Sequence, residues 1–148
     1  MGALNYTAGK REYTLPGGGV IWFDPCDSEF ANKVIMAIRN CQEIQRRFPQ
    51  EGFSDLDEQL ACIQSINDDI RKEIDNAFGD QVADKACCGS SPTSISDGLP
   101  VWMNFLMAVI DEIDANMPEG EKRSRARVQQ YLDKYNTKYA KYAKYMRK

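Results

Sequence analysis

Cysteines and clustered carboxylates are the side chains of this 148-residue sequence best suited to chemistry. An adjacent pair, Cys87 and Cys88, stands out among five cysteines, and three acids gather on one predicted helix, Asp111, Glu112 and Asp114. Adjacent cysteines are poorly placed to chelate one metal ion, and the absence of histidine removes a common ligand and the commonest general base. The acids fall on the expected solvated face of their helix, which does not favour acid–base catalysis. We therefore predict a non-enzymatic protein with no catalytic residue, cofactor or metal.

The C-terminal segment, residues 121–148, is the other stretch whose composition indicates a function, and we call it the basic arm. It holds ten Lys or Arg residues against two acids, a net charge of +8, whereas residues 1–120 sum to −11. No Pro or Gly follows Gly120, so a helix can run through the arm. At 100° per residue its tyrosines fall within an arc of about 120°, beside a sector of lysines that includes Lys138. This tyrosine face consists of Tyr131, Tyr135, Tyr139, Tyr142 and Tyr145.

Four kinds of partner compete for the tyrosine face. It could pack on the acidic body of its own chain, or dock as an amphipathic helix in a groove of another protein or another copy. Lys and Arg interleaved with Tyr would also suit phosphate contacts and base stacking, but an overall charge of −3 argues against a dedicated nucleic-acid-binding protein. Membrane-surface binding is the weakest of the four, because such helices usually anchor through Trp, Phe and Leu. The first two interpretations remain open from the residues alone.

A β-hairpin is predicted over residues 9–24. Its two β-prone runs, 11–15 and 20–23, flank Pro16 and three glycines, which is a strong turn signal. A phosphate-binding loop would need a helix after the glycines, and a strand-like run follows instead. A lone hairpin is marginal in water, so its apolar residues are expected to pack on helices or pair with another subunit. They are Tyr13, Leu15, Ile21 and Phe23, and Trp22 with Phe23 also makes the hairpin a candidate apolar surface for a partner.

Helical periodicity dominates the rest of the body. Helices are predicted over 28–48, 54–78 and 98–117, with a short helix over 80–88 and a flexible polar linker over 89–94. Leu56 and Leu60 head the predicted buried side of the second helix. The third helix is the most apolar and is expected to be central, but its apolar run is about half of what a bilayer-spanning helix needs.

These elements indicate one mainly α domain of about four long helices, with an N-terminal β-hairpin as a minor β component. Residues 1–120 form the acidic body, and the basic arm is either part of the same domain or a protruding helix. The odd number of cysteines lacks the spacing of a disulfide framework, and the first residues lack the pattern of a secretory signal. A reducing cytoplasm is therefore the expected location.

Short motifs and their order resemble the small tail assembly chaperones of phages and prophages of Gram-positive bacteria. They are GKREYTL at 9–15, FANK at 30–33, FGD at 78–80 and the basic Lys/Tyr-rich end. The resemblance implies a non-enzymatic protein of the host cytoplasm that is absent from the finished virion. It also implies binding to the tape measure protein, recruitment of tail tube subunits and a longer frameshifted product. The glycine turn at 17–19 and the serine-rich stretch near 90 have no counterpart in that pattern.

Together these features predict partner binding through the hairpin and the basic arm. In the arm, Tyr135, Tyr139 and Tyr142 would lie along a partner helix while the lysines steer acidic segments. The full predicted set is Trp22, Phe23, Tyr131, Tyr135, Lys138, Tyr139, Tyr142 and Tyr145. Homo-oligomers remain open, and the alternative functions are a nucleic-acid-associated regulator, an inhibitor of a host factor acting through the basic arm, or a structural virion component.

Overall fold

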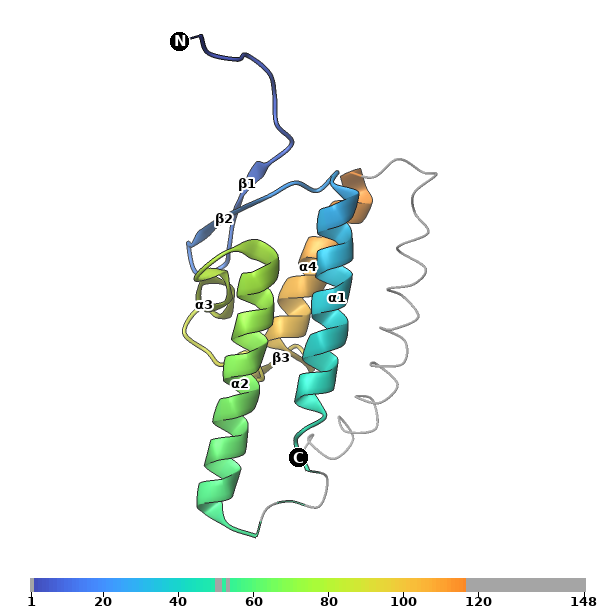
Figure 1. Cartoon of the computed structure of the whole chain (residues 1–148). Coiled ribbons are helices and arrows are strands. Elements are labelled where there is room, and N and C mark those ends of the chain that lie inside the picture. The colour runs from blue at the N-terminus through green and yellow to red at the C-terminus, as the bar shows by residue number, and fades with distance from the viewer. Residues whose placement is uncertain (1, 50–51, 53, 117–148) are drawn as a thin grey trace.

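The computed structural model describes residues 2–49, 52 and 54–116, and it confirms the predicted class of mainly α with a small N-terminal hairpin (Figure 1). The helices are α1 (Ser28–Gln45), α2 (Leu56–Phe78), the short α3 (Val82–Cys87) and α4 (Val101–Asn116). The strands are β1 (Arg11–Thr14), β2 (Val20–Phe23), β3 (Ile95–Ser96) and β4 (Leu99–Pro100), paired as two antiparallel hairpins. The predicted helix of the basic arm lies outside the described residues.

Capping side chains set the ends of the first two long helices. The carboxylate of Asp27 accepts a hydrogen bond from the backbone N–H of Glu29 at the start of α1, as an N-cap residue does. Asp55 caps α2 in the same way through the N–H of Asp57. At the other end of α2, Gly79 adopts a φ of +118°. This residue was predicted to end the helix, and a positive φ there favours glycine.

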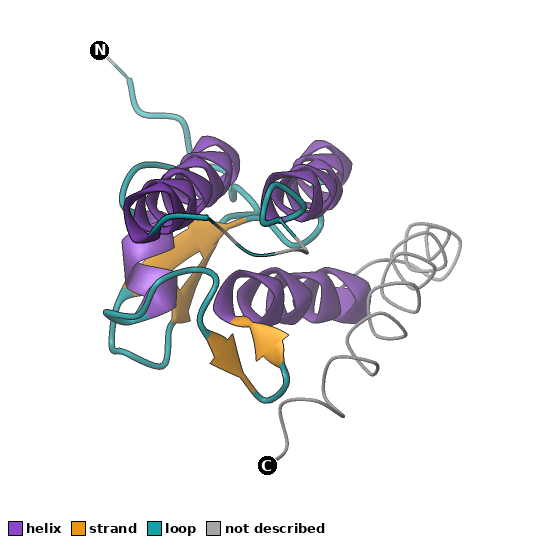
Figure 2. Ribbon diagram, turned by 90° about the horizontal axis from the view of Figure 1, so that it is seen from below, coloured by secondary structure: helices purple, strands orange, loops and turns teal. Residues whose placement is uncertain are grey.

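The core lies between α1, α2 and α4, which Figure 2 shows from below. Apolar residues at helical spacing face inward from each helix, and Val34, Ile70, Ile74 and Leu106 are fully buried. Trp102 of α4 is also fully buried, and its indole Nε1–H donates to the side-chain oxygen of Gln45 at 2.6 Å. The predicted apolar face of the first helix was broken only by Gln45, and this bond explains how the core accommodates that residue.

An aromatic cluster fastens the β1–β2 hairpin to the helices. Strand alternation turns Ile21 and Phe23 inward, where they are 2% and 4% exposed. The Phe23 ring stacks between Tyr13, at 4.2 Å between centroids, and Phe30, at 5.2 Å. Phe78 of α2 meets Phe23 and Phe30 edge-on and continues the cluster to α4. Within the described chain, the hairpin therefore packs on helices, as predicted.

The hairpin turn lies against α3, which restricts side chains at Gly17 and Gly19. Gly18 has a φ of +88°, which lies in the left-handed region. A Cβ added to Gly17 would lie 2.8 Å from the Sγ of Cys88, and one added to Gly19 would lie 3.1 Å from the Cβ of Lys85. The run of three glycines is thus explained by one positive φ and two close approaches.

The segment between α3 and α4 differs from the predicted flexible linker. Asn67, buried in α2, accepts hydrogen bonds from both the backbone N–H and the hydroxyl of Thr93, at 3.1 and 2.9 Å. Pro92 is buried, and its carbonyl accepts from the N–H of Trp102. The β3–β4 hairpin follows, so the last long helix begins at Val101 and not near residue 98. The polar composition of this segment correctly predicted a loop, but it did not predict the hydrogen bonds that hold the loop to α2 and α4.

One acid of α4 also departs from the predicted solvated face. Asp114 is only 9% exposed, whereas Asp111 is exposed as expected. Glu112 is half-buried and accepts a hydrogen bond from the hydroxyl of Tyr13 at 3.0 Å. The hairpin and the last turn of α4 therefore meet through polar contacts.

Candidate partner-binding surfaces

The N-terminal part of α2 extends past the core and carries exposed apolar side chains. Its stripe continues from Ile70 and Ile66 back through Ile63 to Leu60 and Leu56 at helical spacing. Exposure rises along it, from 0% at Ile70 to 57% at Leu60 and 68% at Leu56. The prediction that both leucines are buried is therefore wrong. We call the exposed part of the stripe, Leu56 and Leu60 with half-buried Ile63, the α2 overhang (Figure 1).

Helix lengths explain why no other described helix covers the overhang. At 1.5 Å per residue, the 23 residues of α2 span about 35 Å, whereas the 16 residues of α4 span about 24 Å. The start of α4 is level with Asn67, because Thr93 bonds to Asn67 and Pro92 bonds to Trp102. Leu56 and Leu60 lie further along α2, where α4 has not yet begun.

The surroundings of the overhang are acidic. Residues 48–70 contain six Asp or Glu residues and no Lys or Arg. Asp55 caps the helix, and Glu58 accepts from the hydroxyl of Ser54 at 3.3 Å. Phe48, which is 44% exposed, follows Arg47, whose carbonyl lies 3.9 Å from the Sγ of Cys62. The end of the body thus offers apolar side chains framed by negative charge.

Trp22 and Phe23 are separated by the hairpin. Trp22 pairs with Glu12 across the strands and is 54% exposed, whereas Phe23 belongs to the aromatic cluster. Neighbouring residues of a strand point to opposite faces, so the two side chains cannot form one surface. Phe23 is accordingly removed from the candidate surface, and Trp22 stays in it. The remaining predicted positions, Tyr131, Tyr135, Lys138, Tyr139, Tyr142 and Tyr145, lie outside the described residues.

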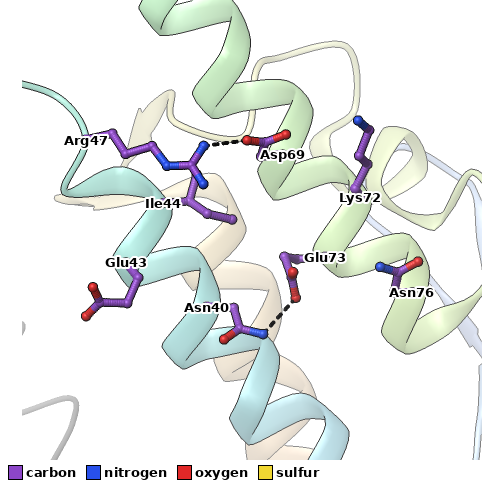
Figure 3. A pocket seen from close by; sticks show the side chains of 8 residues that line it. All are labelled: Asn40, Glu43, Ile44, Arg47, Asp69, Lys72, Glu73 and Asn76. Carbon is purple, nitrogen blue, oxygen red and sulfur yellow. Dashed lines mark hydrogen bonds and ion pairs between the residues drawn. The ribbon is translucent and has the colours of Figure 1, made fainter.

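A polar groove runs between α1 and α2 (Figure 3), with a volume of about 470 Å³. Arg47, in the turn after α1, pairs with Asp69 of α2, and the side-chain amide of Asn40 donates to Glu73 at 3.0 Å. Lys72 also lines the groove. An exposed ion pair of this kind stabilises the fold by roughly 0–1 kcal/mol. These contacts therefore contribute more to the orientation of the two helices than to the strength of their packing.

The cysteines divide into two buried and three accessible or half-buried thiols. Burial raises the pKa of Cys87 to about 11 and raises that of Cys41 further, so neither is a thiolate near neutral pH. Cys26 and Cys88 are exposed, and Cys62 is half-buried. Within residues 2–49, 52 and 54–116, no three His, Cys, Asp or Glu side chains converge as a metal site would require.

Comparison of the chain with protein-family models, curated sequences and solved structures found no match. In the described ranges, no helix is long and apolar enough to cross a membrane. Sequence reasoning placed Trp22 in the candidate surface but missed the α2 overhang. The relative lengths of the predicted helices were the signal that could have revealed it. The apolar stripe of the second predicted helix begins at Leu56, and nothing in the sequence indicates that a neighbouring helix extends to the same level.

Proposed function

We propose that this chain is a non-enzymatic assembly chaperone that binds an elongated helical client, namely the tape measure protein of a phage tail. In this role it keeps the client soluble in the host cytoplasm, assists the addition of tail tube subunits, and is absent from the finished virion. The order of motifs along the chain supports this assignment, as does the mainly α fold with its apolar surface.

The α2 overhang is the observation that carries the proposal. A helix that presents two consecutive leucines of its stripe to solvent, at 57% and 68% exposure, resembles one half of a helix-to-helix contact. Isolated exposed apolar residues are common, but these two continue a stripe that is otherwise buried. A client helix laid along Leu56 and Leu60 would extend the helix packing of the core.

The acidic frame specifies the chemistry of the client. Asp55, Asp57 and Glu58 border the exposed leucines, and opposite charge at the rim of an interface favours encounter and correct register. We therefore expect the client segment to carry apolar residues at three- and four-residue spacing with Lys or Arg on its flanks. Trp22 lies on the hairpin, away from the overhang, and offers a second contact for a long client.

Co-purification with a co-expressed tape measure protein tests this function. Full-length chain with Leu56→Ser and Leu60→Ser should recover at least about tenfold less client than wild type, because each lost apolar contact weakens binding by roughly 1 kcal/mol or more. Met36→Ser is the matched control, since Met36 is 48% exposed but lies on α1, outside the overhang.

Equal recovery with the double variant and wild type would remove the overhang from the binding site. Failure of wild type to retain any client would reject the chaperone function. A titration of duplex and single-stranded DNA at low salt covers the alternative, because phosphate-driven binding must weaken steeply as salt rises.

A further inference from the structure

The α2 overhang and the basic arm are complementary in both charge and apolar character. We propose that the arm of the same chain covers the overhang, with the C-terminal tyrosines of its face packed on Leu56, Leu60 and Ile63. The contact itself needs no client. Its consequence, that the arm and the client compete for one surface, rests on the function proposed above.

Charge favours this pairing over a contact between two overhangs. The arm has a net charge of +8. Of the six acids in residues 48–70, Asp68 and Asp69 pair with Arg71 and Arg47, and the overhang itself is bordered by Asp55, Asp57 and Glu58. Two copies of the overhang would bring these acids together, which opposes association. The arm instead places lysines next to the tyrosine face, so that apolar contact and charge pairing occur along the same helix side.

The part of the chain that the structure describes stops at the end of the body opposite the overhang. Asn116, the last described residue of α4, accepts from the Arg11 guanidinium at 2.6 Å and so lies beside the β1–β2 hairpin. Glu112, one turn earlier, meets Tyr13 of the same hairpin. The overhang lies beyond the start of α4, so the arm must run back along the whole body to reach it.

The arm is long enough to do so, and its length predicts a register. As a helix, residues 121–148 span about 42 Å at 1.5 Å per residue. α4 accounts for about 24 Å of the return path, and Leu60 lies about 10 Å beyond Asn67, which is level with the start of α4. The sum places Leu60 beside a position about 23 residues into the arm. Tyr142 and Tyr145 are the tyrosines nearest that level, whereas Tyr131 would lie beside α4.

Disulfide trapping in the full chain tests this register. Cys26, Cys62 and Cys88 are first replaced by serine, and Cys41 and Cys87 remain because their raised pKa keeps them poorly reactive. Leu60→Cys is combined with either Tyr142→Cys or Tyr145→Cys, and the chain is treated with a mild oxidant. We expect an intrachain disulfide, detected by mass spectrometry of tryptic peptides, in at least one of the two pairs.

Two controls separate specific docking from chance collision. Leu60→Cys with Tyr131→Cys keeps the same chemistry but moves the arm thiol three to four turns away. Ser65→Cys with Tyr145→Cys uses an exposed residue on another side of α2, about 140° from Leu60 on the helical wheel. Both should form the intrachain disulfide at least tenfold more slowly. Equal rates in the control pairs, no intrachain product, or mainly interchain product would overturn the proposal, the last in favour of a second copy. Circular dichroism of each variant verifies that the fold is kept.

The trapped chain then separates this inference from the proposed function. If arm and client share the overhang, the oxidised chain should bind the client at least tenfold more weakly than the same chain after reduction. Undiminished client binding by the trapped chain would refute competition but leave the intrachain contact standing. A trapped chain whose reduced form binds no client would reject the chaperone function alone.

Discussion

The hairpin end and the overhang end of the body both carry large apolar side chains, which are buried at the hairpin end and exposed at the overhang end. At the hairpin end, Phe23, Phe30 and Phe78 are packed ring to ring. At the overhang end, Leu56 and Leu60 stand in solvent on a helix of ordinary amphipathic pattern. The difference is the number of elements that converge: strands and three helices meet around Phe23, whereas α2 alone supplies the overhang.

This contrast assigns different roles to the two ends. Stability should be concentrated where aromatic side chains are shared among many elements, and binding should be concentrated where an apolar stripe lacks a cover. Substitutions that alter the folding free energy should therefore cluster near the hairpin and where α1 packs on α2 and α4. Those that alter partner binding should cluster at Leu56 and Leu60.

The largest expected effect is at Phe23. Phe23→Ala should lower the free energy of unfolding by about 3–5 kcal/mol, because it leaves a cavity among three aromatic rings. Trp22→Ala is the matched control, since this neighbour is 54% exposed on the other face of the strand and should change stability by about 0.5 kcal/mol or less. Urea denaturation of both variants measures the difference. A costly Trp22→Ala would show that the outer face of the hairpin is also covered.

Next in size is Asn67, which lies between the two ends. Asn67→Ala removes the acceptor for both the N–H and the hydroxyl of Thr93, and should cost about 1–3 kcal/mol. Hydrogen exchange of the amides at 91–95 should accelerate in the same variant, because their anchor on α2 is lost. Unchanged exchange would mean that Pro92 and Trp102 hold this segment without Asn67.

Sequence patterns recovered the elements of this fold well but not the extent of their contacts. Asp27 and Gly79 are residue types that favour the start and the end of a helix, respectively. The start of α1 and the end of α2 could therefore be predicted from local residues. Whether Leu56 is buried depends instead on where α4 begins, and that is fixed by the Thr93–Asn67 anchor far away in the chain. Likewise, the alternation of side chains along a strand places Trp22 and Phe23 on opposite faces of the hairpin. Which of the two faces the helices depends on tertiary packing.

Alkaline pH should lower the stability of the fold through its buried thiols. The pKa of Cys87 is about 11 in the folded chain against an ordinary value near 9 in the unfolded chain, so the unfolded state loses its proton first. The free energy of unfolding should be unaffected below pH 9 and should fall as pH rises from 9 to 11, by up to about 1.4 kcal/mol per pH unit from this group. Burial raises the pKa of Cys41 and of Tyr13 in the same direction.

The Cys87→Ala variant provides the control for this pH effect. Its baseline stability will differ because a buried side chain is shortened, so the slope between pH 9 and 11 is the quantity to compare. A shallower slope than wild type is expected from urea denaturation at each pH. An unchanged slope would assign the alkaline loss to Cys41 and Tyr13 alone.

The smallest effect is expected where the hairpin turn meets α3. Gly17→Ala places a Cβ about 2.8 Å from the Sγ of Cys88 and should cost about 1 kcal/mol, since the thiol must move aside. Adding Cys88→Ala removes the obstructing sulfur, so the double variant should regain most of that loss in a double-mutant cycle. If the two changes are simply additive, the cost of Gly17→Ala comes from the backbone of the turn and not from its contact with α3. Coupling would show that α3 supports the hairpin from its turn, an additional contact that the overhang end lacks.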